Sequence, residues 1–268
     1  MQIEQFGPDE IDSFMELAEE EGWVCDHWEF EFLFRSFPRG CLVARDCGRP
    51  AGFITAIRYG SSGWIGNLIV RPELRGRGVG SQLMAGALAA LDDAGTTTIW
   101  LTASRAGKPL YEKLGFAAID VINRWVCTGL AAVTPGPHRL TRAEILALDT
   151  SGWGDRRDTL IDTVISRGRL FAADDAFLVC QPCCDGIQIG PWGGWAGSAP
   201  RLLAHARAAA GDGKRIYLDV PIRNTMQSTL LLGLGFAIKG STLLMYRGTM
   251  PAYVPERVFA LASMGSMG

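Results

Sequence analysis

The second half of this chain repeats the first, and this duplication limits the possible folds more than any other feature of the sequence. The stretch IWLTAS…PLYEKLGF at 99–116 corresponds to IYLDV…STLLLGLGF at 216–236, with a loop three residues longer in the second copy. Each stretch reads as a strand, a helix and a Gly-Phe turn. Similarity of this kind indicates duplication of one folding unit. A chain of 268 residues is long enough for two such units.

Apolar periodicity predicts a similar run of elements in both halves. In the first half we expect helices at 9–21 and 27–34, after residue 80 and before Leu114, and strands at 41–45, 51–58, 64–70, 98–103 and 121–127. In the second half we expect helices at 142–148, 155–166, 200–210 and 224–234, and strands at 170–173, 177–180, 187–190, 215–220 and 243–247. Hairpins mixed with crossovers predict a mixed sheet. The Pro- and Gly-containing stretch 131–138 reads as a linker, giving domains at 1–131 and 138–268.

Composition excludes several classes of function. The net charge of −2 provides no overall field that would attract nucleic acid or an anionic membrane. No apolar run approaches the roughly 20 residues that a membrane-spanning helix needs, and the first residues lack the features of a secretory signal. The seven cysteines are an odd number scattered through strand-like segments, which favours a reducing cytoplasm over a disulfide framework.

The segment Cys180-Gln-Pro-Cys183-Cys184 raises the question of a metal site. A structural zinc site needs four ligands, and no further pair at comparable spacing lies nearby. The Pro-containing tract between two strand-like runs fits a hairpin turn better. We therefore expect no bound metal.

The chemistry of the chain centres on 64–81, WIGNLIVRPELRGRGVGS. A buried-looking strand runs into a glycine-rich loop, and the loop opens a helix. The N-terminus of a helix has backbone N–H groups without partners and a partial positive charge. Glycines let an anion approach this backbone closely, and Arg75 and Arg77 add donors suited to phosphate oxygens. The spacing is neither that of a dinucleotide-binding loop nor that of a Walker A loop.

These residues resemble the GCN5-related N-acetyltransferase (GNAT) family. Arg75-x-x-Gly78-x-Gly80 matches the pyrophosphate-binding signature of that family, Arg/Gln-x-x-Gly-x-Gly/Ala, after the expected strand. About forty residues further on, LYEKLGF at 110–116 matches its second common signature. The resemblance covers nearly all of 1–130, and the tandem layout resembles a subgroup in which a catalytic GNAT domain precedes a diverged copy.

The resemblance implies acetyl-CoA as the cosubstrate, with its pyrophosphate on the backbone of Arg75, Gly76, Arg77, Gly78, Val79, Gly80 and Ser81. It also implies that the strand residues Leu68, Ile69 and Val70 pair with the pantetheine arm, one N–H near Ile69 or Val70 polarising the thioester. Tyr111 is the implied general acid that protonates the leaving thiolate. A phenol with a pKa near ~10 carries its proton at neutral pH.

The general base stays unassigned at this stage. Many members of the family carry a carboxylate on the strand before the phosphate loop, but this strand offers only Gly66 and Asn67 there. Glu20, Glu21, Asp26 and His27 are substitutes, and each also fits a solvated surface position. Glu21 and Trp23 could line a pocket for a cationic amine, with Trp28 and Phe32, although the same aromatic residues fit a packed helix.

The second half has lost the features that mark the first as catalytic. Its glycine-rich stretch, GPWGGWAGSAP at 190–200, contains no arginine, and Leu231 stands where Tyr111 is expected. This copy either stabilises the first or completes its acceptor pocket, for which Trp192, Trp195 and Asp219 are the candidates.

The sequence therefore predicts an α/β (α+β) protein with a mixed, mostly antiparallel sheet flanked by helices, duplicated in tandem. The expected activity is transfer of an acetyl group from acetyl-CoA to a primary amine of a small molecule. Acetylation of a protein or peptide, and non-catalytic binding of acyl-CoA, stay open as alternatives. We expect a cytoplasmic monomer or homodimer that binds neither nucleic acid nor membrane.

Overall fold

The computed structural model describes residues 1–268 except 24, 130–139 and 184–185, so the expected linker at 131–138 lies outside the described residues. The chain divides into two compact units. The first unit comprises residues 1–101, 247–249 and 265–267, and the second comprises 102–246, 250–264 and 268. No helix among the described residues is long and apolar enough to cross a membrane.

The first unit contains five neighbouring strands of the sheet, in the order β1-β2-β3-β4-β5. The strands are β1 (Gln2–Gln5), β2 (Leu42–Asp46), β3 (Arg49–Arg58), β4 (Ser62–Val70) and β5 (Thr98–Ala103, of which the first four residues belong to this unit). Neighbours from β1 to β4 are antiparallel, and β4 and β5 are parallel because α3 (Val79–Asp93) crosses between them. The sheet is therefore mixed, as the sequence predicted.

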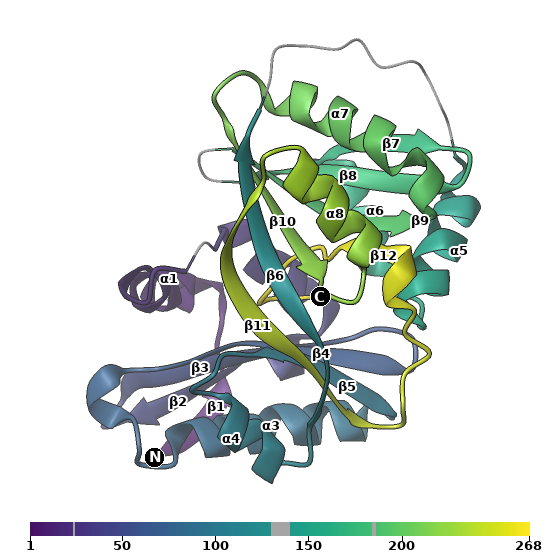
Figure 1. Ribbon diagram of the computed structural model, residues 1–268. Helices are drawn as coiled ribbons and strands as arrows, with labels where there is room; N and C mark the ends of the chain where they lie inside the picture. The colour runs from purple at the N-terminus through teal and green to yellow at the C-terminus, as the bar shows by residue number, and fades with distance from the viewer. Residues whose placement is uncertain (24, 130–139, 184–185) are drawn as a thin grey trace. The chain divides into compact units, whose positions relative to one another are not determined.

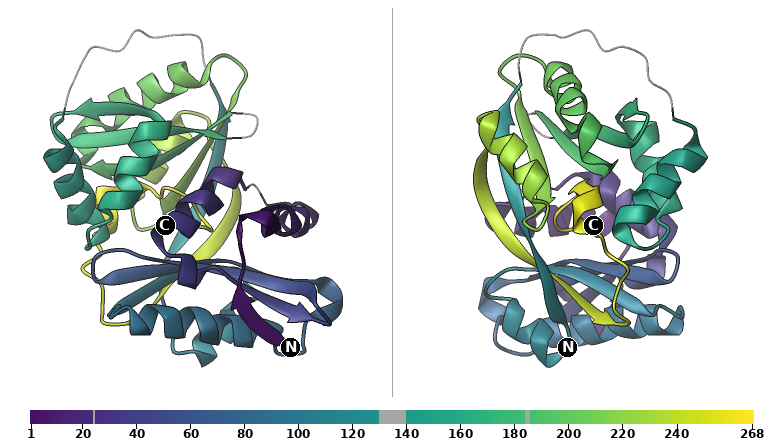
Figure 2. Two further views of the ribbon diagram at one scale, coloured as in Figure 1. Left: turned by 180° about the vertical axis from the view of Figure 1, so that it is seen from behind. Right: turned by 45° about the vertical axis from the view of Figure 1, so that its right-hand side comes forward.

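Helices cover both faces of this sheet (Figure 2). α1 (Ile11–Glu20) and α2 (His27–Ser36) lie on one face and α3 lies on the other. The alternation of β4 shows which residues face which side, because a Cβ on Gly63 would meet Leu91 of α3. Trp64 and Gly66 therefore face the side of α1 and α2. Asp26 caps α2 by accepting a hydrogen bond from the backbone N–H of Trp28 at 3.3 Å.

The second unit repeats this topology. β7 (Arg169–Ala173), β8 (Ala176–Cys183) and β9 (Gly186–Gly194) form antiparallel pairs, and β9 runs parallel to β10 (Arg215–Pro221) through the crossover helix α7 (Ala199–Ala210). α5 (Arg142–Trp153) and α6 (Asp158–Arg167) lie on the face opposite α7 and α8 (Thr225–Gly233) (Figure 1). The duplication predicted from the sequence is thus present in the fold.

One strand from the first half of the chain pairs with strands from the second half. β6 (Ala117–Thr128) comes from the first half of the chain but pairs antiparallel with β10 and with β11 (Ala237–Gly248) in the second unit. α4 (Lys108–Lys113), which carries Tyr111, also belongs to the second unit. We expected a first domain that runs through residue 131 and so includes β6, and we did not expect β6 to pair with strands of the second half.

A short strand, β12 (Val258–Ala260), pairs with β9 in the second unit. β10 pairs with β9 only along Gly186–Ile189, and β12 takes up the pairing with β9 at Trp192 and Gly193. Trp192 is 1% exposed and stacks on Phe259 of β12, with ring centroids 5.2 Å apart. β12 therefore closes the gap where β9 and β10 separate.

Candidate active site

The candidate site begins where β4 and β5 separate in the first unit. Their parallel pairing covers only Ser62–Trp64 of β4, with Trp64 opposite Trp100. Beyond Trp64, no other strand among the described residues pairs with this edge of β4. Its backbone groups are therefore available to an extended ligand, which a strand edge holds by main-chain hydrogen bonds.

The direction of these groups follows from the pairing with β3. The N–H of Arg71 donates to the carbonyl of Ala51 at 3.0 Å, so Arg71 points towards the β3 side. Successive residues of a strand point their N–H groups to opposite sides. The N–H groups of Val70 and Leu68 therefore face the open edge, and that of Ile69 faces β3. Of the two N–H groups expected near the thioester, the geometry favours Val70.

A bulge at Asn67 shapes this part of β4. Asn67 has φ of 55°, unusual for a residue other than glycine, and the β3–β4 register shifts beside it. Its side chain is 5% exposed, and its Nδ2 donates to Oγ1 of Thr55 at 3.0 Å. This hydrogen bond stabilises the distorted backbone at Asn67 and fixes the orientation of its side-chain amide.

The loop after β4 forms a cradle at the start of α3. Gly76 and Gly78 have φ of 74° and 82°, and a Cβ at either position would meet no atom within 4 Å. Gly78 is the N-cap of α3, and the N–H groups of Val79, Gly80 and Ser81 in the first turn have no acceptor within the helix. Open space beside free donors at a helix N-terminus fits a phosphate group. The residues present therefore fit the pyrophosphate of CoA.

Arg75 connects this loop to the first helical pair. Its Nε donates to the carbonyl of Val70 at 2.9 Å, and its Nη2 donates to Oε1 of Glu21 at 2.5 Å. Glu21, expected at the acceptor pocket, is thus paired with an arginine of the phosphate loop. Trp23 is 40% exposed, and its ring lies 6.5 Å from that of Phe14.

Tyr111 lies in α4 of the second unit. Its side chain is 9% exposed and contacts the ring of Phe116 edge-on, with centroids 6.1 Å apart. Burial raises the pKa of the Tyr111 phenol to about 12. The hydroxyl therefore keeps its proton across the physiological range, which a general acid requires.

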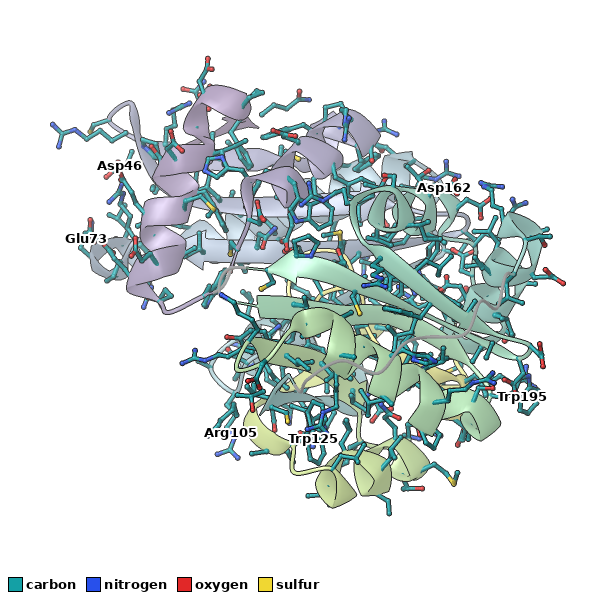
Figure 3. All side chains as sticks on the ribbon, turned by 90° about the horizontal axis from the view of Figure 1, so that it is seen from above. Asp46, Glu73, Arg105, Trp125, Asp162 and Trp195 are labelled. Atoms are coloured by element: carbon teal, nitrogen blue, oxygen red, sulfur yellow. The ribbon has the colours of Figure 1, made fainter. Side chains whose placement is uncertain are left out.

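Asp219 is fully buried in the second unit. Arg124 donates to both carboxylate oxygens at 2.8 Å, and Nε2 of Gln188 donates to Oδ2 at 3.2 Å. Both oxygens are thus engaged within the fold. Of the other two candidates in this half, Trp192 packs against β12 as described. Trp195 is 51% exposed (Figure 3), and the guanidinium of Arg257 lies 4.1 Å from the centre of its ring.

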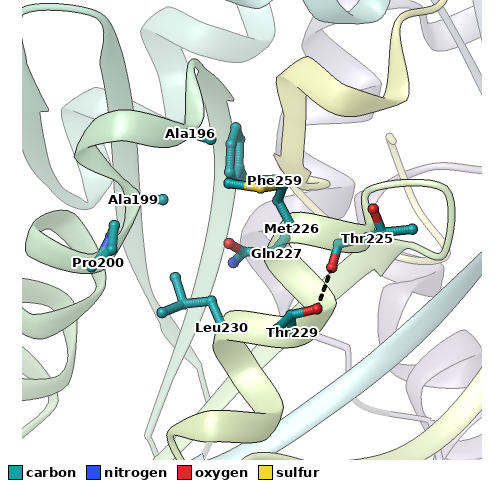
Figure 4. A pocket seen from close by; sticks show the side chains of 9 residues that line it. All are labelled: Ala196, Ala199, Pro200, Thr225, Met226, Gln227, Thr229, Leu230 and Phe259. Carbon is teal, nitrogen blue, oxygen red and sulfur yellow. Dashed lines mark hydrogen bonds between the residues drawn. The ribbon is translucent and has the colours of Figure 1, made fainter.

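The second unit has a cavity of about 350 Å³ beside the N-terminal turns of α7 and α8 (Figure 4). Its lining is mainly apolar, and Phe259 of β12 forms part of it. Gln227, fully buried, also lines the cavity, and neither its Nε2 nor its Oε1 has a hydrogen-bond partner in the described part of the chain. No arginine or lysine lines the cavity, which therefore lacks the charge that a pyrophosphate needs.

Cys180 lies within β8, and β8 and β9 form the expected hairpin. Burial raises the pKa of the Cys180 thiol to about 12, so the thiolate that a metal requires is disfavoured. Cys184 lies outside the described residues.

The residues that the sequence did not single out are Glu29 and Ser266. Oγ of Ser266 donates to Oε2 of Glu29 in α2 and lies 3.3 Å from Oδ1 of Asn67. Ser266 belongs to the segment 265–267, which is part of the first unit. Glu29 appears in the sequence as one acid in an aromatic helix, and nothing in the sequence connects residue 266 with β4.

The class of the protein follows from comparison with known families. Residues 5–116 match the Acetyltransferase (GNAT) family, and residues 145–260 match an Acetyltransferase (GNAT) domain. Together the two matches span most of the chain, which is a tandem member of the GNAT acetyltransferases. The resemblance noted on Arg75-x-x-Gly78-x-Gly80 is confirmed.

Individual relatives agree with this assignment. The chain is 25% identical over 144 residues to an uncharacterised N-acetyltransferase of Methanocaldococcus jannaschii, covering 44% of this chain and 61% of that relative. A candidate acetyltransferase from Pyrococcus horikoshii has the same fold, with a TM-score of 0.87 at 20% identity, over 100% of this chain and 95% of the other. A GCN5-related N-acetyltransferase from Sphaerobacter thermophilus aligns with a TM-score of 0.65 at 15% identity, over 94% and 98%.

Proposed function

We propose that the chain is an acetyl-CoA-dependent N-acetyltransferase that acts on a primary amine of a small molecule. The observation that carries this proposal is the continuity of two features in the first unit. The edge of β4 becomes free of β5 after Trp64, and the same strand leads directly into the Gly76–Gly78 cradle at α3. An extended arm with a pyrophosphate at its end matches this arrangement.

In this reaction the residues of the site would bind the cofactor, stabilise the negative charge on the thioester oxygen and protonate the leaving sulfur. The backbone N–H groups at 76–81, with the side chains of Arg75 and Arg77, bind the pyrophosphate, whereas the backbone N–H of Arg75 itself donates to the carbonyl of Pro72 at 3.3 Å. The N–H of Val70 donates to the thioester oxygen as negative charge develops there, an effect typically worth ~2.7–4 kcal/mol. Tyr111 donates its proton to the departing sulfur.

A small acceptor is favoured over an extended polypeptide by the segment 265–267. A Cβ on Gly66 would lie 2.2 Å from the carbonyl oxygen of Gly265. This segment therefore covers the face of β4 on the side of α1 and α2. A polypeptide acceptor would need this face to be open along its length.

The proposal is tested by following CoA release from acetyl-CoA with a thiol reagent across a panel of polyamines, arylalkylamines and amino acids. Amine-dependent thiol release, with the acetylated amine found by mass spectrometry, is the expected result. Release stimulated only by peptides would replace the small amine by a peptide acceptor. Binding of acetyl-CoA with no release by any acceptor would favour a non-catalytic role.

A further inference from the structure

β4 has no carboxylate, but the carboxylate of Glu29 in α2 is linked to this strand through Ser266. The residues of β4, SGWIGNLIV, include no Asp or Glu. Glu29 lies in the first turn of α2, and its neighbours Trp28 and Phe30 are buried at 8% and 0% exposure. These two aromatic side chains anchor the turn, so that Glu29, itself half-buried, is held in a defined position.

Ser266 connects Glu29 to the bulge of β4. Its side chain is 5% exposed, and its Oγ contacts both Oε2 of Glu29 and Oδ1 of Asn67. Because Nδ2 of Asn67 donates to Thr55, the oxygen of this amide is the atom that faces Ser266. Ser266 has one hydroxyl proton, which it donates to Glu29, so its contact with Oδ1 of Asn67 is a close approach of two oxygens and not a second donated hydrogen bond. A chain of polar contacts therefore runs from Thr55 of β3 through Asn67 and Ser266 to the carboxylate of Glu29.

The segment that carries Ser266 is fixed to the same face of the sheet. Oη of Tyr59 donates to the carbonyl of Met267 at 2.5 Å, and Nε1 of Trp64 donates to the carbonyl of Gly265 at 3.5 Å. Both rings belong to the β3–β4 hairpin of the first unit. The carboxylate is thus positioned within one compact unit, beside the strand whose edge is free beyond Trp64.

From this geometry we infer that Glu29 is the general base of the acetyl transfer and that Ser266 is its positioning residue. This inference rests on the proposed function. The carboxyl oxygens of Glu29 and Oδ1 of Asn67 accept hydrogen bonds, as an ammonium group with three donors requires. The acceptor class that fits this cluster is a primary alkylamine, which arrives protonated at neutral pH.

The protons balance over one turnover. The ammonium gives one proton to Glu29, and the free amine nitrogen forms a bond to the carbonyl carbon of the thioester. The carbon–sulfur bond breaks, and the sulfur leaves with its electron pair and receives the proton of Tyr111. The nitrogen then loses its second proton, which restores Tyr111 through solvent, and Glu29 releases its proton to solvent. The products are the amide, CoA and one proton.

Glu29→Gln separates catalysis from structure, because the Gln carbonyl still accepts from Ser266 but its amide cannot take a proton. Glu31→Gln is the matched control, since Glu31 is exposed on the same helix. We expect Glu29→Gln to lower kcat by about 100-fold or more, with an unchanged KM for acetyl-CoA and an unchanged melting temperature. Glu31→Gln should leave kcat within about twofold of the parent.

Ser266→Ala should lower kcat less, by about 5- to 20-fold, because the carboxylate remains but loses its hydrogen bond. Ser266→Thr keeps a hydroxyl and should recover part of the lost rate, which a purely structural role would not produce. The assay uses the amine of the panel that gives the fastest thiol release.

The experiment distinguishes failure of the Glu29 assignment from failure of the proposed function. If the parent releases thiol with an amine and Glu29→Gln keeps kcat within about threefold, the assignment of Glu29 is overturned while the proposed function stands. If the parent binds acetyl-CoA but releases no thiol with any amine, the proposed function fails and the role of Glu29 fails with it.

Discussion

Trp64 of β4 lies opposite Trp100 of β5 as the last pair of the parallel ladder between these strands, and both side chains are buried. Two large indoles at this position fill the space between sheet and helices just before the strands separate. In the second unit β9 and β10 separate in the same way, but β12 pairs with β9 in the gap. Within the described residues, the first copy of the fold thus leaves this edge of its strand unpaired, and the second copy fills the corresponding edge with its own chain.

The pairing of Arg75 with Glu21 predicts a competition for the arginine. Both a pyrophosphate and the Glu21 carboxylate are partners for this guanidinium, so Glu21→Gln should lower the KM for acetyl-CoA. The expected decrease is about two- to fivefold, the range that corresponds to an exposed ion pair, and it should diminish at high salt. A rise in the KM for the amine with an unchanged KM for acetyl-CoA would instead place Glu21 at the acceptor.

The Gly78 cradle predicts a steric effect that is specific to the cofactor. Gly78→Ala places a methyl group in the space for the pyrophosphate and should raise the KM for acetyl-CoA at least about tenfold, or roughly 1.4 kcal/mol. Gly95→Ala is the matched control, because Gly95 has φ of 75° and equally open surroundings at the other end of α3. Both changes cost about 1–2 kcal/mol of backbone strain. Equal KM values in the two variants would refute the cradle.

The buried phenol of Tyr111 gives two expectations for Tyr111→Phe. The change should lower kcat by about 10²- to 10⁴-fold with little effect on the binding of acetyl-CoA. Because burial raises the pKa of the Tyr111 phenol to about 12, the folded state favours the protonated phenol. This contribution to stability is fully present below the pKa that Tyr111 has in the unfolded chain, and it is lost as the pH rises from that value towards 12. The parent should therefore show no alkaline loss of kcat from Tyr111 below about pH 11. Measured pH–rate profiles of parent and variant check both statements, and a parent kcat that titrates away near neutral pH would exclude Tyr111 as the acid.

The side-chain amide of Gln227, which has no hydrogen-bond partner among the described residues, predicts a gain in stability on its replacement. A buried polar atom without a hydrogen bond costs about 1–3 kcal/mol, so Gln227→Leu should raise the melting temperature by about 2–8 °C. Gln181→Leu is the control, because Nε2 of Gln181 donates to Gly190 at 2.6 Å and to Ala262 at 3.0 Å. That variant should melt at a lower temperature. A lower melting temperature for Gln227→Leu would show that the amide has a partner in solution.

Much of the fold could be predicted from the sequence because the motifs and the expected order of helices and strands indicate the same fold. β5 was expected at 98–103 and occupies Thr98–Ala103, since its apolar run is bounded by clear turn signals. β1 and β12 escaped prediction because strands of four and three residues are too short to show a period. The partners of β6 could not be predicted either, because an alternating strand looks the same in whichever sheet it lies.

The cofactor loop was predicted because its function depends on local backbone geometry, which Gly78 and Gly80 encode within a few residues. The acceptor side depends on contacts between distant segments. Glu29 and Ser266 are 237 residues apart in the chain and meet only in the folded first unit. No local pattern marks such a pair, so the base could not be assigned from the sequence.

We propose that the first copy of the fold binds acetyl-CoA and that the second copy does not. Calorimetric titration of the full chain with CoA tests it most directly, run beside a variant that combines Arg75→Ala with Gly78→Ala. We expect one CoA bound per chain, with binding lost in the variant. Two CoA molecules per chain, or one that binds the variant as tightly as the parent, would contradict it.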